Sequence, residues 1–133
     1  MEREALARWL DAYVEAWKSY DREQIAALFS DDVRYRYHPS DPPIVGREAV
    51  VESWLGEGGH PNASSRDPVG TYDASYAPFA VDRALVVATG TSTYTREPGG
   101  PVDLVYDNCF VMRFDAEGKC REFTEWFVER PAP

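Results

Sequence analysis

The stretch VDLVYDNCFVMRFDAEGKCREFTEWFVE, residues 102–129, consists of two strand-like runs on either side of a turn. Val, Tyr, Phe and Trp are frequent in both runs, and Glu117-Gly118 is typical of a tight turn. Two more runs of this kind, TYDASYAPFAV and ALVVATGTSTYT, precede it, and Pro98-Gly99 marks another turn. The second half of the chain is therefore predicted to be a meander of long antiparallel strands.

The first half of the chain carries helical patterns. Apolar residues recur at steps of three and four between Leu6 and Tyr20, which predicts an amphipathic helix over most of the first twenty residues. A shorter helix is predicted to start at Asp21, where Gln24 completes a capping box, and a third follows Gly46 with the sequence REAVVESWL. A first strand, residues 33–37, lies between them and ends at prolines.

Helices followed by a strand meander indicate the α+β class. We expect a single domain, residues 1–133, in which a curved antiparallel sheet wraps around three N-terminal helices and encloses a pocket. The Gly-, Ser- and Pro-rich segment 56–70 is a long loop, of a length that is common in lids, and His60 within it is expected to be exposed.

Composition excludes several classes of protein. The formal net charge is −9 with no basic stripe, which argues against nucleic-acid binding and against an anionic membrane partner. The sequence contains neither a signal peptide nor an apolar run long enough for a membrane helix. Cys109 and Cys120 lack metal-ligand spacing, and no cofactor or metal motif is present. We therefore expect a cytoplasmic protein with reduced thiols and without a cofactor.

Alternation along the first strand separates two kinds of side chain. Tyr35 and Tyr37 lie on one face, and Arg34, Arg36 and His38 lie on the other. We expect the tyrosines to point inward, because burial of an unpaired guanidinium is far more costly. His38 is then a residue of the rim, or, if a bulge precedes Pro39, a base at the pocket mouth that Asp41 orients.

The last hairpin allows two registers. A simple turn at residues 115–118 pairs Phe110 with Phe123 and Asn108 with Glu125, and it puts Tyr106 opposite Phe127. A bulge at Gly118 shifts the pairing by one residue, so that Trp126 faces Asn108 and Glu125 turns to the other face.

Three short motifs resemble the nuclear transport factor 2-like superfamily, in particular its SnoaL-like and ketosteroid-isomerase-like branches. They are the segments 29–33 (FSDDV), 46–50 (GREAV) and 112–115 (MRFD), the last followed by Gly118-Lys119. The resemblance implies a cone-shaped α+β barrel, and it favours the register in which Phe110, Phe123 and Glu125 face the cavity. It also implies that the first helix covers the cavity, with Tyr13 and Trp17 reaching into it.

The isomerase site is carried over only in part. Its oxyanion tyrosine corresponds to Tyr13, its general-base aspartate to Tyr37, its second oxyanion donor to Phe110 and a supporting tyrosine to Trp54. Only Tyr13 keeps its chemistry, and these residues therefore argue against steroid isomerisation by that mechanism.

The inward face is predicted to carry a polar row among aromatic residues. Counting across Pro98-Gly99 places Thr89 opposite Asn108, next to Glu125. A carboxyl group among aromatics has a raised pKa, which suits Glu125 for acid–base work, with Asn108 orienting it. Alternatively, Asn108, Thr89 or a tyrosine hydroxyl satisfies Glu125, which then only holds the sheet together or orients a ligand. Tyr13, Tyr37 and His38 complete the catalytic candidates. The expected pocket residues are Trp17, Tyr35, Trp54, Thr89, Tyr106, Phe110, Phe123 and Phe127.

Two functions follow from this pocket. The first is a cofactor-free isomerase, cyclase or dehydratase that acts on a small hydrophobic carbonyl or polyketide-like compound; the second is a binding or accessory protein that holds an apolar ligand without turnover. Trp126, Val128 and Val86 are expected on the convex face, through which the resemblance implies a homodimer.

Overall fold

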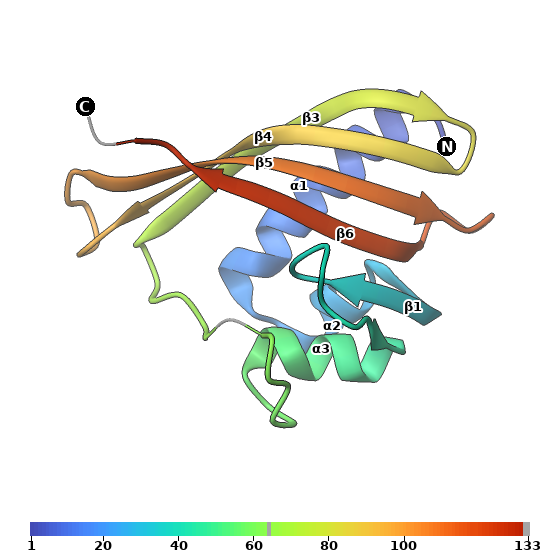
Figure 1. Cartoon of the computed structure of the whole chain (residues 1–133), viewed down its shortest axis with the longest axis horizontal. Coiled ribbons are helices and arrows are strands. Elements are labelled where there is room, and N and C mark those ends of the chain that lie inside the picture. Colours follow the sequence, from blue (N-terminus) through green and yellow to red (C-terminus); the bar gives the residue numbers. More distant parts are fainter. Residues whose placement is uncertain (64, 132–133) are drawn as a thin grey trace.

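The computed structural model describes residues 1–63 and 65–131. The element order is α1 (Arg3–Ser19), α2 (Arg22–Ala26), β1 (Phe29–Arg36), β2 (Ile44–Val45), α3 (Arg47–Leu55), β3 (Tyr72–Asp82), β4 (Leu85–Thr95), β5 (Val102–Phe114) and β6 (Cys120–Glu129). One curved, unclosed sheet with the order β2-β1-β6-β5-β4-β3 holds all six strands (Figure 1). The predicted α+β class is confirmed.

The sheet is mixed rather than wholly antiparallel. β1 runs parallel to β6, with Tyr35 opposite Phe123, whereas the other neighbouring strands are antiparallel. β1 also begins four residues earlier than the sequence predicts, at Phe29. Register shifts occur between β1 and β6, β3 and β4, β4 and β5, and β5 and β6, and they increase the local bending, as bulges do. The long strands therefore curve over α1, which crosses their concave side (Figure 1).

The helices form where the sequence predicts them. The Asp21 carboxylate accepts a hydrogen bond of 2.9 Å from the Gln24 backbone N–H, which caps α2. Gln24 itself accepts from the Ser19 hydroxyl at 2.8 Å and so does not complete the capping box. Gly46 precedes α3 with a φ of 97°, a conformation that favours glycine.

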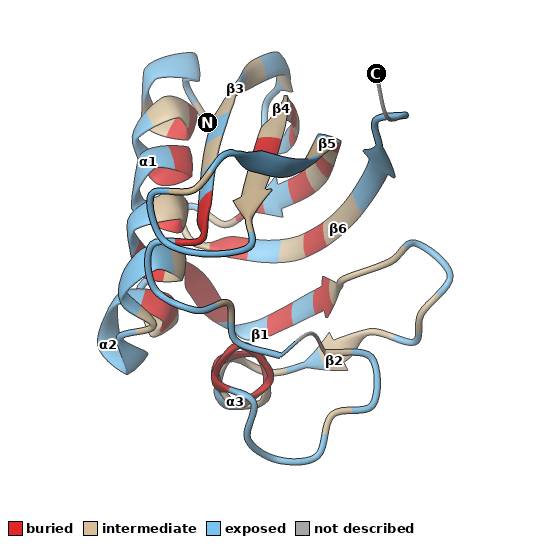
Figure 2. Ribbon diagram, turned by 90° about the vertical axis from the view of Figure 1, so that its left-hand side faces the viewer, coloured by how far each residue is buried: buried red, intermediate tan, exposed pale blue. Residues whose placement is uncertain are grey.

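The apolar faces of α1, α3 and the sheet meet in one core (Figure 2). Trp9 is central to it: its indole N–H donates to the Leu28 carbonyl at 3.0 Å, and its ring lies 5.2 Å from that of Phe114. Phe110 and Phe123 are fully buried, with ring centroids 4.9 Å apart. Within the described residues, no helix is both long enough and apolar enough to span a membrane.

Candidate functional site

The β5–β6 hairpin fixes the direction of Glu125. Its turn runs from Asp115 to Lys119, and the Asp115 carboxylate accepts from the backbone N–H groups of Glu117 and Lys119, both at 2.9 Å. Phe114 pairs with Cys120, and a bulge then shifts the register so that Phe110 faces Glu125.

Neither predicted pairing of this hairpin is therefore correct. The longer turn and the bulge together move the register by two residues from the simple-turn prediction, and a shift of two leaves every side chain on its predicted face. Asn108 pairs with Phe127, and Tyr106 pairs with Glu129. Glu125 points inward as predicted, but its contact with Asn108 is diagonal.

The predicted face of β4 is wrong. The pairing near the Pro98-Gly99 turn is as expected, but a register shift between Tyr94 and Thr95 moves the rest of β4 by one residue. Thr89 therefore pairs with Cys109 on the outer face, and Gly90 lies opposite Asn108. The polar row is completed instead by Ser92, whose hydroxyl donates to Asn108 Oδ1 at 3.1 Å.

The same shift corrects a second prediction. Val86 is buried to 1% exposure in the core, rather than lying on the convex face. Val87 and Leu85, which alternate with it, face outward. A shift of one residue exchanges the two faces of a strand.

Two adjoining cavities open on the concave side of the sheet. The inner chamber, of about 120 Å³, is lined by thirteen residues, of which eight are aromatic. They are Tyr13, Trp17, Tyr20, Tyr35, Tyr37, Trp54, Tyr76 and Tyr94, with Ser65, Asp67, Ser92, Asn108 and Glu125 as the others. Five of these aromatic residues were predicted to line the site: Tyr13 and Trp17 on the first helix, Tyr35 and Tyr37 on the first strand, and Trp54 on the third helix.

The outer chamber, of about 480 Å³, leads from the inner one toward solvent. Tyr37, Ser92, Tyr94, Asn108 and Glu125 line both chambers, so the Glu125 carboxyl group lies at their junction. The remaining wall of the outer chamber includes His38, Arg96, Asp103, Leu104, Tyr106 and Phe127.

Two of the expected pocket residues form core instead of wall. Phe110 and Phe123 are fully buried and contact the Tyr13 ring from below, with ring centroids 5.3 and 5.8 Å from it. Their role is to support the tyrosine that lines the chamber. Thr89, on the outer face, lies away from both chambers.

The electrostatic environment of Glu125 is distinctive. Burial raises the pKa of its carboxyl group to about 7, although the Asn108 hydrogen bond and the nearby His38 both favour the ionised form. Asn108 Nδ2 donates to Glu125 Oε2 at 2.8 Å. The carboxyl group therefore changes its protonation state close to neutral pH.

The phenols of the chamber remain neutral donors. Burial raises the pKa of Tyr13 and of Tyr35 well above their ordinary values, and the charge of Glu125 raises both further. Tyr37, Tyr76 and Tyr94 also have raised pKa values, first from burial and in part from Glu125. Five hydroxyl groups thus lie within electrostatic reach of one carboxyl group.

Individual contacts orient some of these side chains. The Tyr37 hydroxyl and the Ser53 hydroxyl of α3 share a hydrogen bond of 3.0 Å. The indole N–H of Trp54, which is buried, has no hydrogen-bond partner within the described part of the chain. An unpaired buried donor beside a cavity is available to an acceptor atom of a ligand.

His38 lies at the rim of the outer chamber, beside Asp41. Its Nδ1 lies 2.7 Å from Asp41 Oδ2, and its ring lies 5.4 Å from that of Phe127. The side chain is 43% exposed and lines the outer chamber. Its placement between the core and solvent is set by the end of β1 at Arg36, because the strand no longer constrains the next residues.

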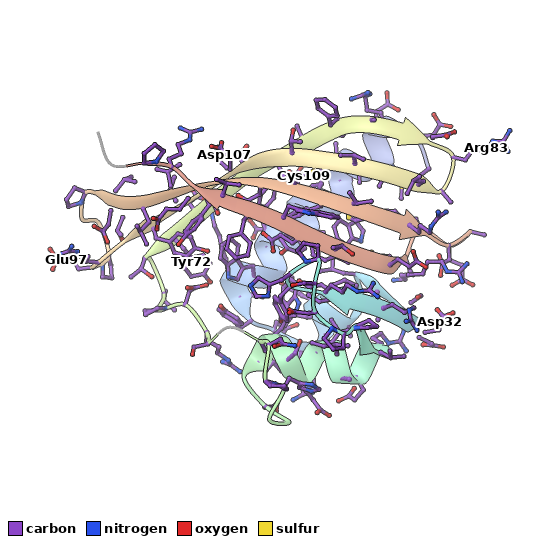
Figure 3. The ribbon with its side chains drawn as sticks, in the orientation of Figure 1. Asp32, Tyr72, Arg83, Glu97, Asp107 and Cys109 are labelled. Atoms are coloured by element: carbon purple, nitrogen blue, oxygen red, sulfur yellow. The ribbon has the colours of Figure 1, made fainter. Side chains whose placement is uncertain are left out.

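The far end of the inner chamber contains a second carboxyl group, which sequence reasoning missed. Asp67 Oδ2 accepts from the indole N–H of Trp17 at 3.1 Å, and the Asp67 backbone N–H donates to the Tyr20 hydroxyl at 2.8 Å. Burial raises the pKa of this carboxyl group. Tyr72, labelled in Figure 3, donates to the Trp17 carbonyl at 2.7 Å.

The segment 56–70 delivers Asp67 to the chamber, although Ser64, within the same segment, lies outside the described residues. No periodicity marks a single aspartate in such a loop, so the sequence offered no signal for it. Tyr76, Ser92 and Tyr94 were also missed, and alternation along β3 and β4 would have found them with the correct register. Over the described ranges, no group of three or more His, Cys, Asp or Glu side chains is arranged to hold a metal ion.

Comparisons with known proteins agree with this architecture. The sequence model of the SnoaL-like domain family matches residues 10–123. An NTF-2 like protein of unknown function from Burkholderia xenovorans LB400 has a similar crystal structure, with a TM-score of 0.66 and 20% sequence identity over 98% of this chain and 88% of that chain. No curated protein sequence matches the chain. The family match spans most of the chain, and the protein therefore belongs to the SnoaL-like domain family of the nuclear transport factor 2-like superfamily.

Proposed function

We propose that this protein is a cofactor-free acid–base catalyst of proton transfer next to a carbonyl group, of the isomerase or lyase type. The observation that carries the proposal is the Glu125 carboxyl group, which has a pKa of about 7 and lies at the junction of two cavities. A catalytic acid or base works best when its pKa is near the working pH.

The proposed reaction uses Glu125 as the base. Its ionised form takes a proton from the carbon next to the carbonyl, and the electron pair of that C–H bond moves to form an enolate. Tyr13 donates a hydrogen bond to the enolate oxygen, and Tyr37 donates a second one once its hydroxyl hydrogen leaves Ser53. In a substrate with a C=C bond next to the deprotonated carbon, the enolate extends over that bond, and Glu125 returns the proton to the far carbon of the C=C bond, which shifts the double bond and completes an isomerisation. Asn108 holds one Glu125 oxygen, so that the other is free for the substrate. His38, oriented by Asp41, can exchange protons with solvent at the mouth.

The size of the chambers suits a small molecule. The inner chamber takes the carbonyl group, and the wider outer chamber, with Leu104, Tyr106 and Phe127 in its wall, takes an apolar substituent. The phenol hydroxyls and the Trp54 indole N–H, which has no partner among the described residues, can donate hydrogen bonds to the substrate carbonyl oxygen.

Exchange of substrate hydrogen for deuterium tests this function. Ketones such as cyclohexanone and acetophenone are incubated in D2O with the protein, and loss of their α-proton signals is followed by NMR. We expect exchange that increases as the pH rises through about 7, because the base must be ionised. Glu125→Gln should reduce the rate by about a hundredfold or more, and Tyr13→Phe by about tenfold or more.

The matched control is Glu117→Gln, which removes the same carboxyl group from an exposed turn. It should exchange like the unmodified protein. Equal rates for Glu125→Gln and the unmodified protein would rule out Glu125 as the base. Binding of the ketones without any exchange would favour the alternative, a protein that holds its ligand without turnover.

We also propose that two copies associate through the outer face of the sheet. The support is a group of apolar side chains on β4, β5 and β6, in which Trp126 is 43% and Val128 68% exposed, beside Val87 and Cys109. Asp107, which pairs with Val128 and forms an ion pair with Arg130, borders this group. Sedimentation equilibrium should give a dimer for the unmodified protein and a monomer for Trp126→Asp. A monomer for both would refute this association.

A further inference from the structure

We propose that the inner chamber binds a cationic ammonium group at its Asp67 end, so that the ligand of this protein is a small amine or quaternary ammonium compound. For a substrate, this rests on the proposed function, which places the carbonyl group of the same molecule beside Glu125. The ammonium subsite is the part of the chamber formed by Asp67, Trp17 and Tyr20, none of which lines the outer chamber.

The first argument is the balance of charge around the chamber. Its lining contains two carboxyl groups, Asp67 and Glu125, and no Lys, Arg or His. Among the described residues, neither carboxyl group has an ion-pair partner within 4.0 Å, whereas eight pairs between a carboxylate and a Lys or Arg side chain form elsewhere in the molecule. Charged groups inside proteins are normally paired, and a ligand cation is the partner that this chamber lacks.

The second argument is the aromatic wall around Asp67. The Trp17 ring lies 6.1 Å from that of Tyr94, and both the Trp17 indole and the Tyr20 hydroxyl are hydrogen-bonded to Asp67. Aromatic rings attract cations through their quadrupole, and rings around a carboxylate are a favourable surrounding for an ammonium group. A neutral apolar ligand would gain nothing from the carboxylate and would have to desolvate it.

Arg66, which precedes Asp67 in the chain, does not fill this role. The Arg66 guanidinium lies 5.2 Å from the centre of the Tyr20 ring, and its Nε donates to the Leu55 carbonyl at 3.1 Å. Arg66 is exposed and does not line either chamber. It therefore shows that the Tyr20 ring accepts a cation on one side, and it leaves the Asp67 carboxylate open toward the cavity.

The volume of the inner chamber limits the size of the ammonium group. About 120 Å³ corresponds to about four water molecules at ~30 Å³ each, which is enough for a trimethylammonium head but not for a large ring system. The rest of the ligand would pass Glu125 into the outer chamber. An ammonium group with a short chain is thus a better fit than a steroid-sized molecule.

Choline and 3,3-dimethylbutan-1-ol form a matched pair of probes, because they have the same shape and differ in the charge of one central atom. Binding is measured by isothermal titration calorimetry and by the fluorescence of tryptophan, since Trp17 and Trp54 line the chamber. We expect choline to bind with a dissociation constant of roughly 1 mM or tighter, and the neutral alcohol at least about tenfold more weakly. Equal binding of the two probes, or no binding of either, overturns the inference.

Variants locate the site. Asp67→Asn keeps an oxygen that can accept from Trp17 and Tyr20, so the loop remains anchored while the charge is removed. It should weaken choline binding by about tenfold or more and leave binding of the alcohol unchanged. Asp11→Asn removes the same charge from the exposed side of α1 and should leave both affinities unchanged. Equal loss of choline binding in Asp67→Asn and Asp11→Asn would place the effect in the overall charge and overturn the proposed subsite.

The choline-binding experiment and the deuterium-exchange experiment test the two proposals independently. Absence of choline binding together with Glu125-dependent exchange of ketones would refute the ammonium subsite and leave the proposed function standing. Choline binding that depends on Asp67, without any Glu125-dependent exchange of ketones, would refute the catalytic role and leave the subsite standing.

Discussion

Replacement of Glu125 by glutamine should change how the stability of the protein depends on pH. Burial raises the pKa of the Glu125 carboxyl group from 4.5 to about 7 in the folded chain. Between these two values the unfolded chain has lost the proton while the folded chain keeps it, so the free energy of unfolding falls as the pH rises. Below 4.5 both states are protonated, and above about 7 the loss is complete.

The structure sets the size of this effect. The interval from 4.5 to about 7 corresponds to a ceiling of about 3 kcal/mol, because each pH unit is worth about 1.4 kcal/mol. Glu125 is only partly buried at the junction of the chambers, and solvent lowers the penalty on its charged form. We therefore expect about 2 kcal/mol. Glu125→Gln lacks the ionisable group, so it should become more stable relative to the unmodified protein by this amount as the pH rises from 4.5 to 7.5.

Urea unfolding followed by tryptophan fluorescence, at one-unit intervals from pH 4.5 to 7.5, measures the difference between the two proteins. Other titrating groups are common to both and cancel in the difference. Glu117→Gln, in an exposed turn, should differ from the unmodified protein by the same small amount at every pH. A flat difference for Glu125→Gln, or a relative loss of stability as the pH rises, would refute the buried carboxyl group that the proposed function requires.

Two further substitutions test the supports of the site. Asn108→Ala removes the hydrogen-bond donor that favours the ionised form of Glu125, so the pKa of Glu125, followed by infrared spectroscopy of its carboxyl band, should rise above about 7. Ser92→Ala should alter this pKa less, because Ser92 contacts the other end of the Asn108 amide. A lower pKa of Glu125 in Asn108→Ala would contradict this account. Gly90→Ala would bring a Cβ against the Ser75 carbonyl and should lower the free energy of unfolding, measured in urea, by about 2–4 kcal/mol. Gly99→Ala has open space around the new Cβ but a φ of 75°, and it should lower the free energy of unfolding by about 1 kcal/mol. Equal losses of stability in the two variants would show that β3 moves away from the new Cβ at Gly90.

Local interactions explain why the helices could be predicted. The period of apolar residues in α1, the Asp21 cap of α2 and Gly46 before α3 act within a few residues of the chain, and the structure places these helices as expected. The faces of β1 follow in the same way, since an inward Tyr35 and an outward Arg34 satisfy burial whichever strand lies beside them.

Strand pairing was predicted less well, because bulges depend on interactions between strands. The predicted register of the last hairpin was wrong by two residues, and Glu125 still points inward as predicted because a shift of two keeps each side chain on its face. Thr89 was placed on the wrong face because the pairing of β4 with β5 shifts by one residue near Tyr94. A sequence read as a simple alternation cannot show where an extra residue is inserted.

The sequence by itself determined the α+β class, the three helices, and a concave surface rich in tyrosine, because periodicity and capping depend on neighbouring residues. Only the tertiary structure decided that Asp67 meets Trp17 and Tyr20, that Ser92 rather than Thr89 supports Asn108, and that two chambers join at Glu125. These contacts join residues from sixteen to fifty positions apart in the chain. Their formation depends on sheet curvature and register, which are properties of the whole assembled sheet.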